Sequence, residues 1–360
     1  MRESGYKVVL TGEGADENFG GYPLYQPDFL REPDLAWPSS VLSEDSDLIS
    51  SLQEEKEAQV AATYTAIGAD ATNRAPNLAS RQLNGITTIS SMQAFNPPVS
   101  IFEPWTQRLF GNLDPRETIA NNIDGRTKSM IKNQWHPLHA AQYVWTKGHL
   151  ANNFLSCLGD RTEMAHSVEA RTPFLDHHLT EYVNSLPPSL KIKYSVPDEV
   201  NRAQASAGAT TNGHVHTNGV TSNGTSTNGN EPSSKRPRSL STAQARNGRF
   251  IEKYILREAA RPFITDELYK RTKHPYSAAT VYPPNGPVHR FFKRVATQDR
   301  VESLGFVSWK AVEPLIEQAF DEETAEAIRS RAVRLVLIVA QWVILGERFG
   351  IRSATEGDHI

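Results

Sequence analysis

A short apolar run followed by a glycine-rich acidic turn lies near the start of the chain and most constrains its fold. Residues 8–10 (Val-Val-Leu) predict a short buried strand within Lys7–Thr11, and the chain continues Thr-Gly-Glu-Gly-Ala-Asp-Glu over 11–17. Gly12 and Gly14 allow a sharp turn and a close approach of the backbone to a ligand. Ligands of open α/β sheets bind beyond the carboxyl ends of the strands, so acidic side chains at this turn indicate a binding site.

Three sequence blocks, in this order, resemble those of the asparagine synthetase family. The first is the acidic turn, which ends Gly-Gly-Tyr at Tyr22. The second is Asp160–Asp176, which reads Asp-Arg-Thr-Glu-Met-Ala-His-Ser-Val-Glu-Ala-Arg-Thr-Pro-Phe-Leu-Asp. The third joins Lys-Tyr-Ile-Leu-Arg-Glu at 253–258 to Arg-Thr-Lys-His at 271–274. The resemblance implies an ATP-dependent amide ligase, which adenylates aspartate and lets ammonia attack the acyl-adenylate.

Two features of the family are absent from the sequence. The sequence contains no Ser-Gly-Gly-x-Asp-Ser loop, which in the family wraps the ATP pyrophosphate. Its single cysteine is Cys157 rather than an N-terminal nucleophile. We interpret the chain as the C-terminal part of a synthetase domain, without the glutaminase domain. A complementary N-terminal part that carries the glutaminase and the pyrophosphate loop is the expected partner. Alone, the chain is expected to have no ligase activity.

The resemblance assigns roles to four residues of the acidic turn. Thr11 and Gly12 are the expected nucleotide contacts. Asp16 is the expected ligand of Mg²⁺, a cation that prefers oxygen ligands and bridges phosphate oxygens. Glu13 is the expected catalytic carboxylate, acting as a polar positioner or as a proton acceptor for ammonia. The alternative for Glu13 is a carboxylate that only complements the positive end of a helix dipole.

The later blocks supply two candidate lysines and a candidate scaffold. Lys273 is the expected catalytic lysine, beside the pyrophosphate and the reacting carboxyl, where a compact mobile cation is useful. Lys253 is a second expected phosphate neighbour, with an exposed helix lysine as the alternative. Glu169, Arg171 and Asp176 are interpreted as a buried ion-pair scaffold behind the nucleotide, since charged residues are seldom buried unless paired.

The fold class expected from these patterns is mostly α with a remnant of a parallel α/β sheet, an incomplete adenine-nucleotide alpha-hydrolase-like fold. Lys7–Thr11 is the only convincing strand, and a parallel strand needs neighbours that the sequence does not indicate. A possible short strand lies around 99–102. Helices are predicted over Asp45–Gly68 and from Pro137 onward, where apolar residues recur every three or four positions.

The chain divides into three segments by composition. By the resemblance, residues 1–196 are expected to be the first part of an asparagine-synthetase-like domain, and 249–360 its C-terminal helical part. Residues 197–248 contain four Asn-Gly pairs among Ser and Thr, with few large apolar side chains. Such a segment cannot bury enough surface to offset its ordering entropy, which predicts a disordered low-complexity insertion.

Charge and hydropathy limit the partners and the location. The net charge of −3 gives no sign of a nucleic-acid partner. One cysteine fits a reducing compartment, and no apolar signal segment occurs near Met1. The apolar stretch 332–345 is interrupted by Arg334 and Gln341 and is shorter than the ~18 residues of a membrane span, so it predicts a buried core helix ending near Gly346. We expect a cytoplasmic protein with no membrane partner.

The sequence is compatible with several functions. The first is asparagine biosynthesis, with ATP and Mg²⁺ as cofactors and with aspartate and either ammonia or glutamine as substrates. An amidotransferase acting on another carboxylate in secondary metabolism is the alternative. A β-lactam synthetase-like ligase would have Tyr where this chain has Glu13, so that residue favours the asparagine type. The last alternative is a non-catalytic fragment or pseudo-enzyme that binds a partner.

Overall fold

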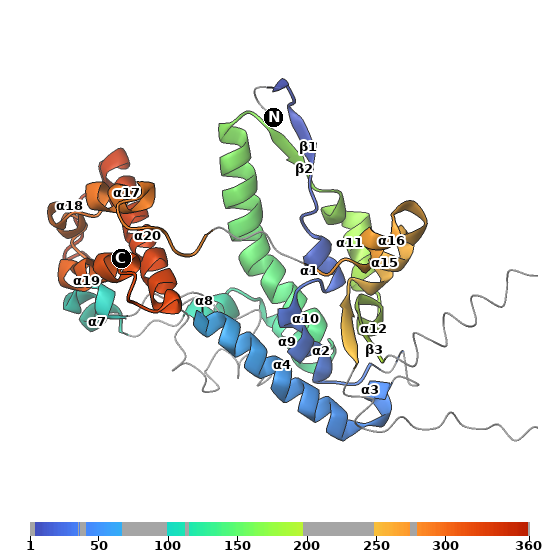
Figure 1. Cartoon of the computed structure of the whole chain (residues 1–360). Coiled ribbons are helices and arrows are strands. Elements are labelled where there is room, and N and C mark those ends of the chain that lie inside the picture. The colour runs from blue at the N-terminus through green and yellow to red at the C-terminus, as the bar shows by residue number, and fades with distance from the viewer. Residues whose placement is uncertain are drawn as a thin grey trace, which may run out of the picture.

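Helices make up most of the described chain, and its strands form two separate two-stranded sheets (Figure 1). The computed structural model describes residues 4–34, 36, 41–66, 99–111, 115–196, 248–273 and 279–358. The expectation of a mostly helical chain with a small parallel sheet is confirmed. The more specific adenine-nucleotide alpha-hydrolase-like fold and the three-segment division stay predictions. The predicted disordered insertion lies outside the described residues except for Gly248.

The first sheet joins the acidic turn to the second sequence block. β1 (Val8–Leu10) pairs in parallel with β2 (Glu169–Arg171), and Val9 lies opposite Ala170. The prediction of a strand without an identifiable neighbour was therefore wrong. β2 was not predicted because its sequence, Glu-Ala-Arg, lacks the apolar alternation that is typical of a strand.

β1 is not the buried strand that its sequence predicted. The side chains of Val8 and Leu10 are 48% and 73% exposed. In Figure 1 the β1–β2 pair lies near the top of the molecule, next to the upper end of the green helix Thr146–Glu163. Parallel sheets are usually covered on both faces by other structural elements. The apolar side chains of β1 are typical of such a covered strand, but the described residues do not cover them.

The second sheet closes the two ends of the segment 197–248. β3 (Ile192–Ser195) and β4 (Arg249–Glu252) pair antiparallel, with Ser195 opposite Arg249. The chain therefore leaves and re-enters the fold at one place, which fits the low entropic cost of lengthening a loop whose ends are already held together.

Helices around these sheets form one apolar core, whose buried members include Tyr25, Leu48, Leu138 and Ile192. A smaller cluster around Ile131 packs beside it. The elements of this part are α1 (Ala15–Phe19), η2 (Pro23–Tyr25), α2 (Gln26–Leu30), α3 (Val41–Glu44), α4 (Ser46–Ala66), α8 (Pro115–Asn121), α9 (Gly125–Asn133), α10 (Pro137–Trp145), the π-helix η5 (Thr146–Glu163), η6 (Pro173–Leu175), α11 (His177–Asn184), α12 (Pro188–Lys191), α15 (Tyr254–Ala260), η7 (Arg261–Phe263) and α16 (Asp266–Lys270). The helices predicted over Asp45–Gly68 and from Pro137 are confirmed as α4 and as α10 with η5.

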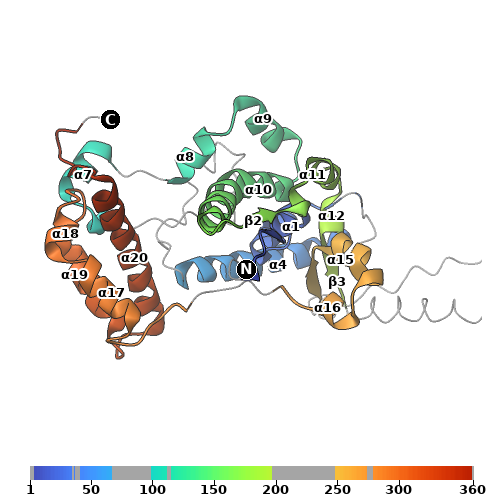
Figure 2. The ribbon, with the colours of Figure 1, turned by 90° about the horizontal axis from the view of Figure 1, so that it is seen from above.

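A second apolar core lies in the C-terminal part. It unites η4 (Val99–Ile101) with α17 (Pro287–Val295), α18 (Gln298–Glu302), α19 (Trp309–Phe320) and α20 (Glu326–Phe349). α7 (Pro104–Phe110) buries no side chain in it and is joined to this part by the hydrogen bond from Trp105 Nε1 to Gly305 O. Figures 1 and 2 both show these helices grouped at one side of the molecule, away from the two sheets. The short strand considered around 99–102 is a 3₁₀ turn, and Phe102 forms only an isolated bridge with Val307.

α20 corrects the prediction made for the apolar stretch 332–345. The helix buries one face, with Val336 and Val339 fully enclosed, while Leu345 on another face is exposed. It ends at Gly350, in the left-handed region, and Gly346 lies inside it, so the predicted end was wrong. No helix among the described residues combines the length and the apolar character needed to cross a membrane.

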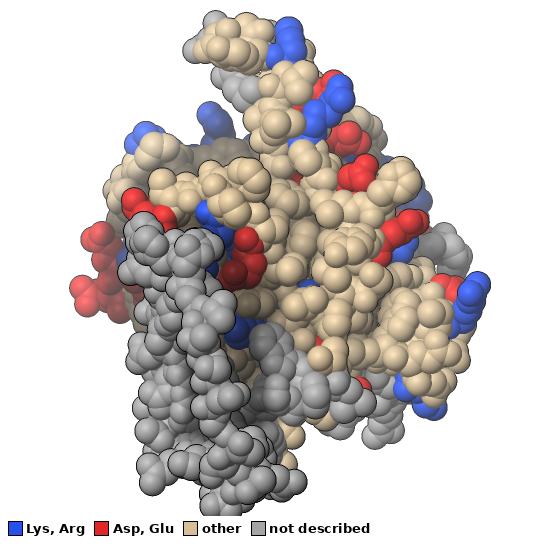
Figure 3. Space-filling view, turned by 90° about the vertical axis from the view of Figure 1, so that its right-hand side faces the viewer, with Lys and Arg blue, Asp and Glu red and all other residues tan. Residues whose placement is uncertain are grey.

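Charges do not gather into a field of one sign on the face that carries α15 and α16. Figure 3 shows basic and acidic side chains interspersed over this face. A local cluster of one carboxylate and two ammonium groups lies instead beside α1.

Candidate active site

A buried carboxylate shapes the acidic turn. Glu17, the third residue of α1, accepts hydrogen bonds from the backbone N–H of Gly14 (3.1 Å) and from the Tyr22 hydroxyl (2.7 Å). Gly14 has a φ of 92°, which a residue with a Cβ rarely adopts, and a Cβ there would lie 2.3 Å from Leu175 Cδ2. Burial and the neighbouring Glu17 raise the pKa of Tyr22, which keeps its hydroxyl a neutral donor. The turn is therefore held by its own side chains.

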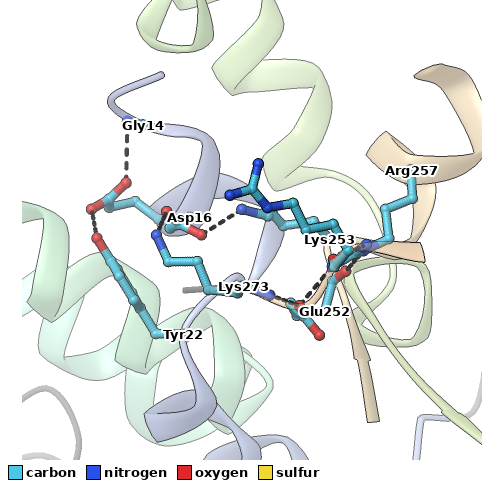
Figure 4. Close-up of polar contacts among 9 residues, drawn as sticks. Gly14, Asp16, Tyr22, Glu252, Lys253, Arg257 and Lys273 are labelled. Atoms are coloured by element: carbon cyan, nitrogen blue, oxygen red, sulfur yellow. Dashed lines mark hydrogen bonds and ion pairs between the residues drawn. The ribbon is translucent and has the colours of Figure 1, made fainter. Parts of the chain in front are cut away.

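Asp16 projects from this turn into the centre of a lysine–aspartate cluster, defined here as Asp16, Lys253 and Lys273. Its Oδ1 pairs with Lys253 Nζ and its Oδ2 with Lys273 Nζ, both at 2.7 Å (Figure 4). Lys253 lies between β4 and α15, and Lys273 follows α16. The ammonium group of Lys273 also lies 5.6 Å from the centre of the Tyr22 ring, within the range of a cation–π contact.

Glu13 lies within electrostatic range of the cluster. Burial raises the pKa of its carboxyl, the charges of Glu17 and Asp16 raise it further, and Lys273 partly opposes them. A raised pKa makes a carboxylate a better proton acceptor near neutral pH. Glu17 rather than Glu13 supplies the carboxylate at the start of α1, which weakens the alternative that Glu13 only complements a helix dipole.

Thr11 and Gly12 leave room for a ligand at the end of β1. The Thr11 backbone N–H donates to Arg171 O at 2.9 Å, whereas its side-chain Oγ1 is buried and has no hydrogen-bond partner among the described residues. A Cβ on Gly12 would meet no atom within 4 Å. Buried hydroxyls are nearly always paired, so the unpaired Oγ1 fits a ligand there. The two lysines paired with Asp16, further along the same turn, are cations of the kind that bind phosphate groups.

The same residues do not fit a metal ion at Asp16. Both carboxylate oxygens are paired with ammonium groups, and among the described residues there is no group of three or more His, Cys, Asp or Glu that could hold a metal. A cation would have to displace a lysine to reach Asp16. The metal role of Asp16 stays a prediction.

The second block does not form the buried ion-pair scaffold that its composition suggested. Arg171 Nε pairs with Glu169 at 2.7 Å, but the two side chains are 59% and 47% exposed on the surface of β2. Asp176 caps the start of α11 by accepting from the Leu179 N–H. The prediction of a buried scaffold was wrong, because β2 lies in an uncovered sheet and its alternate side chains face solvent.

A buried amide–lysine pair supports the end of α1 from behind. Gln142 Nε2 donates to the carbonyl oxygens of Glu17 (2.6 Å) and Asn18 (3.0 Å), and its Oε1 accepts from Lys191 Nζ (3.0 Å). Lys191 is fully buried, and burial lowers its pKa to about 7. Sequence reasoning missed this pair, since nothing local links α10 to α12.

Replacing Gly21 with Ala is expected to disrupt the lysine–aspartate cluster. A Cβ there would lie 2.0 Å from Asp16 Oδ1 and 2.8 Å from Asp16 Cα. Overpacking against backbone is expected to cost about 2 kcal/mol in the free energy of unfolding. Urea unfolding measures the effect, with Gly12→Ala as the control, since a Cβ there meets no neighbour. Equal midpoints for the two variants would contradict the prediction.

The sequence of this chain is similar to a known protein family and to two fungal proteins. A family model described as asparagine synthase matches residues 1–202 and 239–344. Amidase chyE of Penicillium rubens is 36% identical over 356 residues, which cover 98% of this chain and 44% of that protein. Amidase chry2 of Gibberella zeae is 34% identical over 355 residues, which cover 99% of this chain and 44% of that protein. No solved structure matches the chain. The chain thus spans less than half the length of these two relatives.

Proposed function

Since this chain belongs to the asparagine synthase family, we propose that it provides the carboxylate-activating site of an ATP-dependent amide ligase. One observation carries the proposal: Asp16 joins Lys253 and Lys273, from segments far apart in the chain, beside Glu13. Two cations and a base at the end of a parallel strand are what phosphate binding and amide formation require.

The proposed roles follow from the positions of the side chains. The two ammonium groups share one carboxylate, so a triphosphate with more negative charge would compete with Asp16 for them. Thr11 Oγ1 would take the nucleotide as its missing hydrogen-bond partner. ATP supplies the chemistry that turns a carboxyl oxygen into a leaving group. Glu13 would then accept the proton that nitrogen loses as ammonia attacks the activated carbonyl.

Two substrates are proposed for this site. The family name favours aspartate, with asparagine as the product. The relatives in Penicillium rubens and Gibberella zeae are both named amidases, which favours amidation of a different carboxylate in secondary metabolism. Ammonia, or ammonia released from glutamine, is the proposed nitrogen donor in both versions.

We further propose that the ligase needs a complementary N-terminal part. β1 exposes Val8 and Leu10, and the two matched relatives are more than twice as long as the aligned region. Apolar side chains on an uncovered parallel sheet favour packing against another structural element. The partner would cover this sheet and carry the glycine-rich pyrophosphate loop.

Carboxylate-dependent ATP–pyrophosphate exchange tests these proposals. The assay compares aspartate with a panel of other carboxylic acids, for the chain alone and for the chain joined to the N-terminal part of a longer relative. We expect exchange only in the joined protein, with one acid clearly preferred, and its loss in Lys273→Ala. Lack of exchange with every acid in the joined protein would favour the non-catalytic alternative.

A further inference from the structure

The two lysines of the cluster reach Asp16 from two separate stretches of the chain: Lys253 is the junction between β4 and α15, and Lys273 follows α16. Lys253 has a φ of 53°, in the left-handed region that few residues other than glycine adopt. Lys273 lies beyond the end of α16, in a segment without helix or strand. β4 and α15 flank Lys253 directly, whereas no helix or strand holds Lys273. Another contact must therefore fix the Lys273 segment relative to Lys253.

One guanidinium group joins the two stretches. Arg257, on the first turns of α15, donates from Nε to the carbonyl oxygen of Glu252 at 2.8 Å. Its Nη1 donates to the carbonyl oxygens of Tyr269 and Arg271, both at 2.8 Å. These acceptors are the residue just before Lys253 and two residues shortly before Lys273. Arg257 therefore links the backbone on both sides of the cluster.

The Glu252 carboxylate completes the link. Its Oε1 pairs with Arg257 Nη2 at 2.6 Å and also accepts the backbone N–H of Lys273 at 3.1 Å (Figure 4). The side chains of Arg257 and Glu252 are only 16% and 15% exposed, so solvent screens their pairing weakly. A single carboxylate oxygen thus joins the guanidinium directly to the peptide of Lys273.

We propose that Arg257 and Glu252 are positioning residues that hold Lys253 and Lys273 at the spacing needed for the phosphates of the substrate nucleotide. This inference rests on the proposed function, because the phosphates are the ligand of the two lysines. A planar guanidinium reaches four acceptors at fixed angles, and the ammonium of a lysine cannot reproduce this geometry. Arg257→Lys is therefore the informative change, since it keeps the charge and removes the fork.

The first measurement needs no ligand. Acetylation of the intact chain, followed by mass spectrometry, reports how freely each lysine amine reacts. Lys253 and Lys273 are expected to react slowly while paired with Asp16, and severalfold faster in Arg257→Lys. Exposed Lys270 is the internal reference. Arg261→Lys is the matched control, because Arg261 stacks on Tyr269 and donates no described hydrogen bond to the segments that carry the two lysines.

The second measurement is calorimetric titration of the chain with inorganic pyrophosphate. Arg257→Lys is expected to weaken binding about tenfold, because displacements of ~1 Å can cost up to about 100-fold where several groups must act together. Glu252→Gln, which keeps an acceptor for the Lys273 N–H, is expected to weaken it less. In a Lys273→Ala background Arg257→Lys should have a clearly smaller effect, since residues acting through one another are not additive.

The outcomes separate this inference from the proposed function. Unchanged lysine reactivity in Arg257→Lys, in a protein whose melting temperature shows it is folded, would overturn the inference. The inference would also be overturned if Arg257→Lys lowered the affinity for pyrophosphate equally in the wild-type and Lys273→Ala backgrounds, because equal losses indicate a general structural effect. Faster lysine reactivity in Arg257→Lys, with pyrophosphate binding that Lys253→Ala and Lys273→Ala leave unchanged, would support the positioning contact and overturn the phosphate site. If Arg257→Lys does not fold, Glu252→Gln decides by the same readouts.

Discussion

Replacing Glu13 with Gln is expected to lower amide formation at least about 100-fold, the usual contribution of a positioned general base. Gln keeps the size of the side chain but cannot accept the proton that nitrogen loses as ammonia attacks. Thr11, Lys253 and Lys273 are untouched, so nucleotide binding should change little. The measurement is ammonium-dependent amide formation, beside ATP binding, in the chain joined to the N-terminal part of a longer relative.

The pH dependence supplies the control for this prediction. Burial and neighbouring carboxylates raise the pKa of Glu13, and Glu163 is one of those neighbours. Because a base acts only when deprotonated, activity should rise with pH through a pKa higher than that of an ordinary glutamate. Glu163→Gln removes a negative charge, lowers the pKa of Glu13 and should shift this limb to lower pH without abolishing activity. Retention of more than a tenth of the activity in Glu13→Gln would remove Glu13 from the mechanism.

Replacing Lys191 with Met is expected to stabilise the protein at pH 7 and to lose that advantage at pH 10. Burial lowers the pKa of Lys191 to about 7 in the fold, from the 10.5 of an exposed lysine. Between pH 7 and pH 10.5 the Lys191 amine is protonated in the unfolded chain but mostly neutral in the folded one. The free energy of unfolding of the wild type therefore rises with pH over this range. At pH 7 this difference costs the fold about 4 kcal/mol. Met removes that cost but leaves Gln142 Oε1 unpaired, a loss of ~1–3 kcal/mol.

Urea unfolding at the two pH values measures the balance. The variant should be about 2 kcal/mol more stable than the wild type at pH 7, and no more stable at pH 10, where the cost of burying the charge has largely vanished. Lys193→Met is the control, since it removes a lysine two residues along, at a partly exposed position over the Tyr254 ring. A destabilised Lys191→Met protein at pH 7 would show that the buried amine has stronger partners than Gln142.

Local sequence was sufficient to identify the parts of the site. The Thr-Gly-Glu-Gly-Ala-Asp-Glu run indicated the turn, since only glycine tolerates the φ of 92° found at Gly14. Glu13, Asp16, Lys253 and Lys273 were candidates from their motifs, and the structure brings them together beside α1. The helices α4 and α10 were predictable from periodic apolar residues and from Pro137, because such signals depend on neighbours a few positions away.

Only the tertiary structure decided how these parts meet. The pairing of β1 with β2, the enclosure of Lys191 and the link from Arg257 to Lys273 all join segments whose partners are not marked in the local pattern. Burial likewise depends on what covers a surface, so the apolar β1 is exposed and the charged β2 is no buried scaffold. Sequence by itself determined which side chains are candidates for the proposed chemistry, through residue type and backbone preference. Their distances, partners and pKa values came from long-range packing, which no local spacing encodes.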